Sequence, residues 1–276
     1  MTTQKSILIT GCSSGIGLAS AIELKARGWR VFATARKPED LAMLEGKGVE
    51  ALYLDYAERH SVSSCAAEVS KRTGGKLDAL FNNGAYGQPG AVEDLTREVL
   101  EAQFAANVFG WLQLTNLCLP LMRANGAGRI VHCSSVLGLV AMKWRGAYNA
   151  SKFAIEALAD TQRLELKGTG IHVALIEPGP IATRFIETAL KFFDANINEK
   201  SSHYKQQYVR QRARLSGSTR NKWKLPPEAV VKKLIHAVEA PNPRARYFVT
   251  VPTYMAAVAK RILPQPLLDR FVERGS

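Results

Sequence analysis

The chain has 276 residues and a formal net charge of +13, with 46% hydrophobic and 22% charged residues. This composition excludes a disordered chain, and a domain of this length buries enough surface to fold without disulfides or a structural metal. The four cysteines have neither the spacing of a zinc site nor that of a redox motif, which predicts reduced thiols in a cytoplasmic protein and no metal site.

The positive charge is concentrated in the last third of the chain. From residue 184 onward there are 18 Lys and Arg against 7 Asp and Glu, whereas the first 183 residues hold 19 against 17. Such a surplus suits anionic membranes, nucleic acid, an anionic ligand or simply a solvated surface. No nucleic-acid module is recognisable, so we expect no nucleic acid binding.

The expected elements alternate along the chain. The first strand, at 6–10, is followed by a helix at 15–27. The second strand, at 29–34, is followed by a helix at 41–47, and the third, at 51–54, by a helix at 62–72. The fourth strand, at 77–81, is followed by a long helix at 96–123, and the fifth, at 129–133, by a helix at 147–167. Two further strands are expected at 171–176 and 247–251. This order predicts an α/β fold over residues 1–276: a single doubly wound Rossmann domain with a central parallel sheet of about seven strands.

The chain changes character after Pro178. Residues 185–221 are aromatic and basic, and Pro226-Pro227 then opens a helix. Because open α/β sheets bind ligands beyond the carboxyl ends of their strands, we predict a substrate lid at 185–225. Its aromatic residues either line a pocket for a lipophilic substrate or pack the lid on the core. They are Phe185, Phe192, Phe193, Tyr204, Tyr208 and Trp223, with Met142 and Trp144 before Tyr148.

The last segment, residues 251–272, is apolar with basic residues and is interrupted by Pro264 and Pro266. Basic amphipathic helices rest on membrane surfaces, so peripheral membrane contact is one interpretation. The prolines shorten any helix, which favours a contact with the core or with another subunit.

Glycines join the first expected strand to the first helix. Gly11, Gly15 and Gly17 allow a tight turn and let a pyrophosphate approach the backbone, while the helix presents free N–H groups to it. The intervening Ser13, Ser14 and Ile16 complete the predicted phosphate cradle. The glycine spacing, three residues and then one, departs from the usual dinucleotide fingerprint.

At the end of the second strand, where NAD-binding sites carry an acidic residue that holds the ribose hydroxyls, this chain has Ala35, and Arg36 follows it. A guanidinium can grip a 2′-phosphate that a carboxylate would repel. The position therefore favours NADP(H), although a solvent-exposed loop residue is the simpler interpretation.

Tyr148 and Lys152 lie four residues apart on an expected helix, so they share a face. A tyrosine titrates near pH 10 and needs a neighbouring ammonium and a cationic nicotinamide to act as an acid–base at neutral pH. Ser134 and Ser135 follow the fifth strand, where a hydroxyl can hold a substrate oxygen. Asn107 interrupts a helix with an amide that needs a partner.

Together these motifs resemble the short-chain dehydrogenase/reductase family, over about residues 5–184. Residues 10–17 match its TGxxxGxG cradle, and residues 148–152 match its YxxxK signature. Asn82 to Ala85 read Asn-Asn-Gly-Ala, where the family usually has Asn-Asn-Ala-Gly, which leaves the role of Gly84 open. The steroid and retinol dehydrogenase branch is the nearest in these segments.

The resemblance implies roles for named residues. Tyr148 would exchange a proton with the substrate oxygen, Lys152 would lower the pKa of Tyr148, and Ser135 would position the substrate. Asn107 would distort its helix and hold a water in the proton relay. The remaining implied cofactor contacts are Asp55 at the adenine, Asn83 and Gly84 at the adenine ribose, and Pro178, Gly179 and Thr183 at the nicotinamide.

Two expectations about function follow. The chain is expected to be an NADP(H)-dependent oxidoreductase that moves hydride between nicotinamide and an alcohol or carbonyl carbon, working as a homodimer or homotetramer through its long helices. The alternative is a dinucleotide-sensing regulatory protein on the same fold, which would need the cradle but not the acid–base residues.

Overall fold

The computed structural model describes residues 4–215 and 222–275. Within these residues seven parallel strands form one sheet in the order β3-β2-β1-β4-β5-β6-β7, which confirms the predicted Rossmann-type fold class. The strands are β1 (Ser6–Ile9), β2 (Arg30–Ala35), β3 (Glu50–Tyr53), β4 (Ala79–Asn82), β5 (Gly128–Cys133), β6 (Ile171–Glu177) and β7 (Arg246–Phe248).

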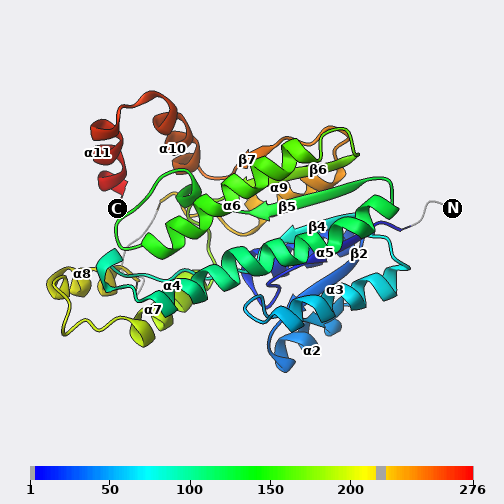
Figure 1. The fold of residues 1–276 in the computed structure, drawn as a ribbon, viewed down its shortest axis with the longest axis horizontal. Helices are drawn as coiled ribbons and strands as arrows, with labels where there is room; N and C mark the ends of the chain where they lie inside the picture. Colours follow the sequence, from blue (N-terminus) through cyan, green and yellow to red (C-terminus); the bar gives the residue numbers. More distant parts are fainter. Residues whose placement is uncertain (1–3, 216–221, 276) are drawn as a thin grey trace.

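Helices cover both faces of the sheet (Figure 1). On one face, α3 packs against α5, while α6 lies over β6; on the other, α1 packs against α9. The helices up to the sixth strand are α1 (Gly15–Ala26), α2 (Pro38–Gly46), α3 (Arg59–Thr73), α4 (Arg97–Phe104), α5 (Gly110–Ala124) and α6 (Gly146–Glu165). Those after it are α7 (Phe185–Asn196), α8 (Lys205–Leu215), α9 (Glu228–Glu239), α10 (Val251–Ile262) and α11 (Gln265–Gly275).

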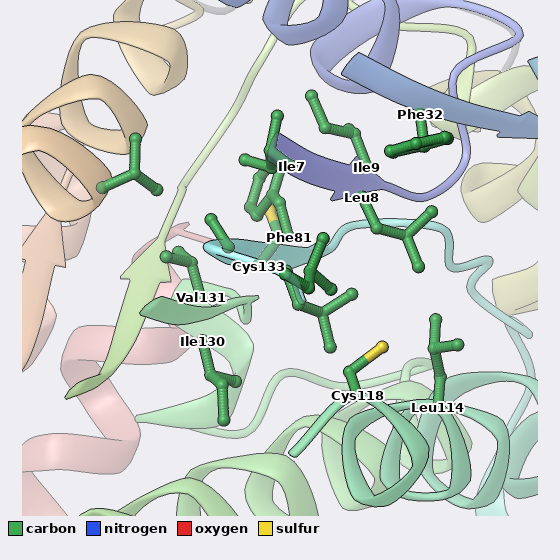
Figure 2. Close-up of a cluster of buried hydrophobic side chains, with 14 of the residues drawn as sticks. Ile7, Leu8, Ile9, Phe32, Phe81, Leu114, Cys118, Ile130, Val131 and Cys133 are labelled. Carbon is green, nitrogen blue, oxygen red and sulfur yellow. The ribbon is translucent and has the colours of Figure 1, made fainter. Parts of the chain in front are cut away.

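The central strands are buried on both faces. Ile7, Leu8 and Ile9 of β1 are all fully buried, as expected for a parallel sheet between two helical layers. Figure 2 shows these side chains together with Leu114 and Cys118, which α5 contributes to the same core. The burial fixes the positions of the loops at the carboxyl ends of the strands.

The chain reverses its winding direction at β1. Since β1 lies between β2 and β4, the loops that leave β1 and β4 diverge toward opposite faces and open a crevice between them. The glycine loop and the segment at Asn83 therefore meet at this point.

The helix predicted at 96–123 is divided by a π-helical segment, Ala105–Phe109, between α4 and α5. Asn107 lies within that segment. A π turn adds a residue to the helical turn and is found mostly at functional sites. The prediction of one regular helix was therefore wrong at its centre, whereas the distortion implied by the family resemblance is present.

The strand predicted at 247–251 was wrong at both ends. β7 covers Arg246–Phe248, and α10 begins at Val251. Pro252 lies in the first turn of α10, where its missing N–H and fixed φ suit a helix and would interrupt a strand. Apolar residues alone did not reveal this boundary.

The predicted lid, residues 185–225, contains α7 and α8, and its residues 216–221 lie outside the described part of the chain. α7 and α8 lie at the same end of the molecule as α10 and α11 (Figure 1). Among the described helices, none has the length and apolar character needed to cross a lipid bilayer.

Candidate active site

The loop after β1 has a backbone that only glycine suits. Gly11 and Gly15 have φ of +68° and +58°, in the left-handed region. A Cβ on Gly17 would lie 2.3 Å from the carbonyl oxygen of Gly11. Ser14 precedes α1 in an extended conformation and makes no side-chain cap, so the first N–H groups of α1 stay available to an anion. Ser13 lies half-buried in this loop, and Ile16 lies half-buried in the first turn of α1.

The loop after β4 is fastened to this cradle. Thr10 Oγ1 accepts hydrogen bonds from the backbone N–H groups of Asn83 (2.9 Å) and Gly84 (3.1 Å). The Asn83 side chain donates to the Thr10 carbonyl at 3.0 Å. A Cβ on Gly11 would lie 2.5 Å from the Cα of Gly84, so the two loops are in direct backbone contact. Gly84 thus supports the close approach of the loops.

Arg36 lies beyond the end of β2 with its side chain 65% exposed. Its Nη1 is 3.4 Å from Oδ2 of Asp55, beyond the end of β3. Asp55 Oδ1 also accepts a hydrogen bond from the Ala57 N–H at 3.0 Å. A cation and an acidic side chain therefore stand together at the rim of the crevice.

Lys152 is held inside the protein by α6. Its side chain is almost fully buried, and its Nζ donates a 2.8 Å hydrogen bond to the carbonyl oxygen of Cys133 at the end of β5. The same Nζ lies 4.4 Å from the ring centre of Trp111 and 5.5 Å from that of Tyr148. Burial lowers the pKa of Lys152 to about 8, so the ammonium form still prevails at neutral pH.

Tyr148 is buried beside this ammonium. Burial raises the pKa of its phenol well above the usual 10, and a hydrogen bond with the Ser135 side chain opposes that shift. For the protein by itself this direction is opposite to the lowering expected from the sequence. A phenolate in a dry site loses its hydration, and this loss is the largest cause of the raised pKa.

Ser135 and Asn107 approach the same place from two other elements. Ser135 is the second residue after β5, and its Oγ accepts a hydrogen bond from the Leu137 N–H at 3.1 Å. Asn107, fully buried in the π segment, donates to the Tyr86 carbonyl at 2.8 Å and to Ser151 Oγ at 3.2 Å. Because Ser151 precedes Lys152, Asn107 connects the distorted helix to the turn that carries the tyrosine and lysine.

The segment after β6 closes the crevice from the other side. The Pro178 carbonyl accepts a 2.8 Å hydrogen bond from Val136 N–H, just after Ser135. Gly179 packs so closely on Thr250 that a Cβ there would lie 2.1 Å from its Oγ1. Thr183 lies over the cradle, since a Cβ on Gly15 would be 2.9 Å from Thr183 Cγ2. A groove of about 540 Å³ continues outward between Ser14 and Thr183.

The aromatic residues near the lid divide into two sets. Phe185 lies with its ring centre 5.3 Å from that of Tyr148, and Phe192 stacks on Tyr86 at 4.0 Å. The other set packs the lid on the body: Phe193 and Tyr208 are buried in a cluster with Trp144 and Tyr204. Trp144 has a left-handed φ of +64°, and Tyr208 donates a hydrogen bond to Asp94. The packing interpretation is therefore confirmed for Phe193, Tyr204 and Tyr208, whereas a substrate pocket beside Phe185 and Phe192 stays a prediction.

Two parts of the site were not found from the sequence. Trp111 lies four residues after Asn107, so helical spacing could have placed it on the same face. The Cys133 carbonyl that holds Lys152 is a backbone atom, which leaves no trace in the residue type. His132 is buried against Trp111, as predicted for a packed histidine, and burial lowers its pKa to about 4.

The crevice suits a nicotinamide dinucleotide. The glycines of the cradle leave no room for side chains, which suits the approach of a pyrophosphate, and the buried tyrosine lies beside Ser135, next to the Val136 N–H that donates to the Pro178 carbonyl. The candidate cofactor contacts and Ser135 thus follow the carboxyl ends of the strands, and Lys152 is hydrogen-bonded to the end of β5, while Asn107 is buried and connected to Tyr86 and Ser151.

Comparison with known proteins agrees with this geometry. Residues 5–191 match the family model described as short chain dehydrogenase. An uncharacterized oxidoreductase of Escherichia coli, YbbO, is 43% identical over 98% of this chain and 94% of its own. An NADPH-dependent 3-dehydrocapnine reductase of Ornithobacterium rhinotracheale is 33% identical over 95% of this chain and 94% of its own. Human 17-beta-hydroxysteroid dehydrogenase type 1 is 32% identical over 88% of this chain and 77% of its own.

Among solved structures, a short-chain dehydrogenase from Streptomyces avermitilis superposes with a TM-score of 0.78 at 27% identity. The match covers 100% of this chain and 99% of that one. The glycine cradle, the tyrosine–lysine pair and the sheet topology thus occur together in a chain that is matched almost from end to end. This protein belongs to the short-chain dehydrogenase family and is an oxidoreductase.

Proposed function

We propose that this protein is an NADP(H)-dependent oxidoreductase acting on a lipophilic alcohol or carbonyl compound. The observation that carries the proposal is the meeting of Tyr148, Lys152 and Ser135 in a buried site at the end of the glycine-lined crevice. A regulatory protein that only senses a dinucleotide would have no need of this acid–base set.

The bound cofactor would supply or accept the hydride. The protein residues then handle the oxygen: in carbonyl reduction the Tyr148 phenol gives its proton to the developing alkoxide, and in oxidation it takes a proton from the alcohol. Ser135 holds that oxygen by a hydrogen bond. Lys152, fixed by the Cys133 carbonyl, stabilises the phenolate that forms, and Asn107 keeps the turn at Ser151 in place.

The preference for NADP(H) rests on Arg36. Its exposed guanidinium beyond β2 pairs with Asp55 at 3.4 Å and would exchange that partner for a 2′-phosphate, and one relative of this chain is named as NADPH-dependent. We expect Arg36→Ala to weaken NADPH binding about 10- to 100-fold while NADH binding changes little, because a charge-assisted hydrogen bond contributes about 1.5–3 kcal/mol. Titration of both cofactors by fluorescence measures this.

Lys37→Ala is the matched control, since Lys37 is an equally exposed neighbour paired with Glu39 at 3.5 Å. It should leave both affinities nearly unchanged. Equal affinities of the unaltered protein for NADPH and NADH would contradict the cofactor assignment, whatever the variants do.

The proposed substrate class follows from Phe185 and Phe192, which present rings beside Tyr148 and Tyr86. Burying apolar area contributes about 25 cal/mol per Å², so steroid ketones, retinal and long-chain aldehydes should show kcat/KM at least about tenfold above small polar ketones. NADPH absorbance across such a panel measures this. Phe185→Ala should reduce the difference, and Val209→Ala, an exposed position on α8, should not.

Equal kcat/KM for small polar ketones and lipophilic compounds would remove the lipophilic part of the proposal and leave the reaction class intact.

We also propose association into a homodimer or homotetramer through α5 and α6. These helices expose the apolar side chains of Leu112, Leu117, Phe153, Leu158 and Leu164. A cytoplasmic location, based on the four free cysteines, stays a prediction.

A further inference from the structure

The exposed face of α10 carries an apolar stripe. Its members follow helical spacing, so they lie in one row along the helix. They are Val251, Tyr254, Met255, Val258 and Ile262, each 48% to 70% exposed. The opposite face of α10 is buried, through Thr253, Ala256, Ala257 and Ala259. The stripe is therefore not the core-facing side of the helix, and Leu267 of α11, 46% exposed, adds a further apolar side chain nearby in the chain.

Positive charge borders this stripe. Arg261 follows Tyr254 by seven residues and so lies along the same side of α10 at the edge of the stripe, whereas helical spacing places Lys260 on the opposite side. On α11, Arg270 follows the exposed Leu267 by three residues. Of the acidic residues of α11, Glu273 pairs with Lys143 at 2.7 Å, while Asp269, next to Arg270 in sequence, accepts a hydrogen bond from the uncharged Gln265 of the same helix.

We propose that the α10 stripe and its basic border dock on the surface of an anionic lipid bilayer. An exposed apolar face with arginines at its edge is the pattern of helices that lie in the plane of the membrane interface. Tyr254 at the edge of the stripe is of the type that gathers at the headgroup level. A face of this kind binds by two additive contributions, buried apolar area and attraction of Lys and Arg to anionic headgroups.

The docking surface adjoins the candidate active site. Ala256 and Ala259 of α10 and Leu268 of α11 form a buried cluster with Val140 and Val136, in the segment that directly follows Ser135. The ion pair between Lys143 and Glu273 joins α11 to the same segment. A membrane under α10 would thus lie close to the crevice, where a lipophilic substrate dissolved in the bilayer could enter. The docking itself does not depend on the proposed reaction.

Vesicle sedimentation tests the proposal with the full-length protein. We expect it to pellet with vesicles of phosphatidylcholine containing 30 mol% phosphatidylglycerol and to pellet much less with phosphatidylcholine alone. Raising the salt concentration should weaken the binding by screening the headgroup charge. Arg261→Ser and Arg270→Ser should each reduce the partition coefficient about fivefold.

Val258→Asp and Ile262→Asp should each lower the partition coefficient at least about tenfold. Ile22→Asp on α1, 43% exposed and far along the chain, is the matched control and should bind like the unaltered protein. Circular dichroism would confirm that each variant is folded, and turnover with a water-soluble substrate should stay unchanged in all three. These readouts separate membrane docking from the proposed reaction.

Failure of the unaltered protein to sediment with the anionic vesicles at low salt would overturn the proposal. So would unchanged sedimentation of Val258→Asp and Ile262→Asp. The unaltered protein could fail to bind vesicles while light scattering shows a lower particle mass for Val258→Asp and Ile262→Asp than for the unaltered protein. That result would assign the stripe to contact between two copies of the chain instead.

Discussion

Tyr148→Phe is expected to lower kcat by about 10²- to 10⁴-fold while NADPH binds with unchanged affinity. General acid–base catalysis contributes this much, and phenylalanine removes only the hydroxyl that exchanges the proton. The ring contacts with Phe185 remain available to the variant. Steady-state kinetics with the best substrate of the panel, together with NADPH titration, measure both quantities.

Tyr204→Phe is the matched control, because Tyr204 packs against Trp144 in the lid cluster and lies outside the proton path. It should retain most of the turnover. If Tyr148→Phe turned over at the rate of the unaltered protein, the acid–base assignment would be wrong and the dinucleotide-sensing alternative would gain support.

The pH dependence of this reaction should reveal what the cofactor contributes. In the protein alone, burial raises the pKa of Tyr148 above 10, whereas Lys152 titrates at about 8. A neutral phenol is the proton donor required for reduction and a poor base for oxidation. A bound oxidised nicotinamide would bring positive charge to the site, and positive charge near the phenol favours its ionised form.

Arg246→Met is expected to lower the free energy of unfolding by about 3–5 kcal/mol at neutral pH. Arg246 on β7 binds Glu156 of α6, Glu177 of β6 at 2.5 Å and Asp160 of α6 at 2.6 Å. The Glu177 side chain is fully buried and that of Glu156 is 9% exposed. Removing the cation deprives Glu156 of its charged partner and leaves the fully buried Glu177 side chain without its hydrogen-bond donor, which is the costly way to break a buried pair.

The pH dependence of this loss has a definite sign. Burial and the neighbouring Glu156 raise the pKa of Glu177 to about 8, so its contribution to stability is present below about pH 4.5 and is lost as the pH rises through 8. Without Arg246, which lowers the pKa of Glu177, this carboxyl resists ionisation still more. The difference between the variant and the unaltered protein should therefore be smaller at pH 5 than at pH 8.

Urea unfolding at the two pH values measures these differences. Adding Glu177→Gln to Arg246→Met should recover part of the loss, because the neutral amide needs no cation. Asp160→Asn, at a side chain 40% exposed, is the control and should cost less than about 1 kcal/mol. A loss below 1 kcal/mol for Arg246→Met would show that the cluster does not stabilise the edge of the sheet.

This cluster also lies close to the site. Glu156 is one helical turn beyond Lys152, and Glu177 directly precedes Pro178. Arg246 thus ties the helix of the lysine to the strand whose end borders the nicotinamide position. Sequence periodicity gave no sign of it, since its four members come from three separate elements.

The strand order and the candidate site differ in how far the sequence predicted them. Alternating apolar runs and helical patterns predicted the parallel Rossmann sheet, because strands buried on both faces need continuous apolar residues. Element boundaries were less secure. Pro252 decided where α10 begins, and the packing around Asn107, which bonds to Tyr86 and Ser151, accompanies the π turn.

By itself the sequence determined the glycine cradle and the helical spacing of Tyr148 and Lys152, because both depend on local backbone geometry. Only the tertiary structure decided the rest. The buried position of the phenol, the Cys133 carbonyl that holds Lys152, and the division of the aromatic residues between site and lid all depend on contacts between distant segments. So does the outward orientation of the apolar row on α10, since an amphipathic pattern does not say which face the core will cover.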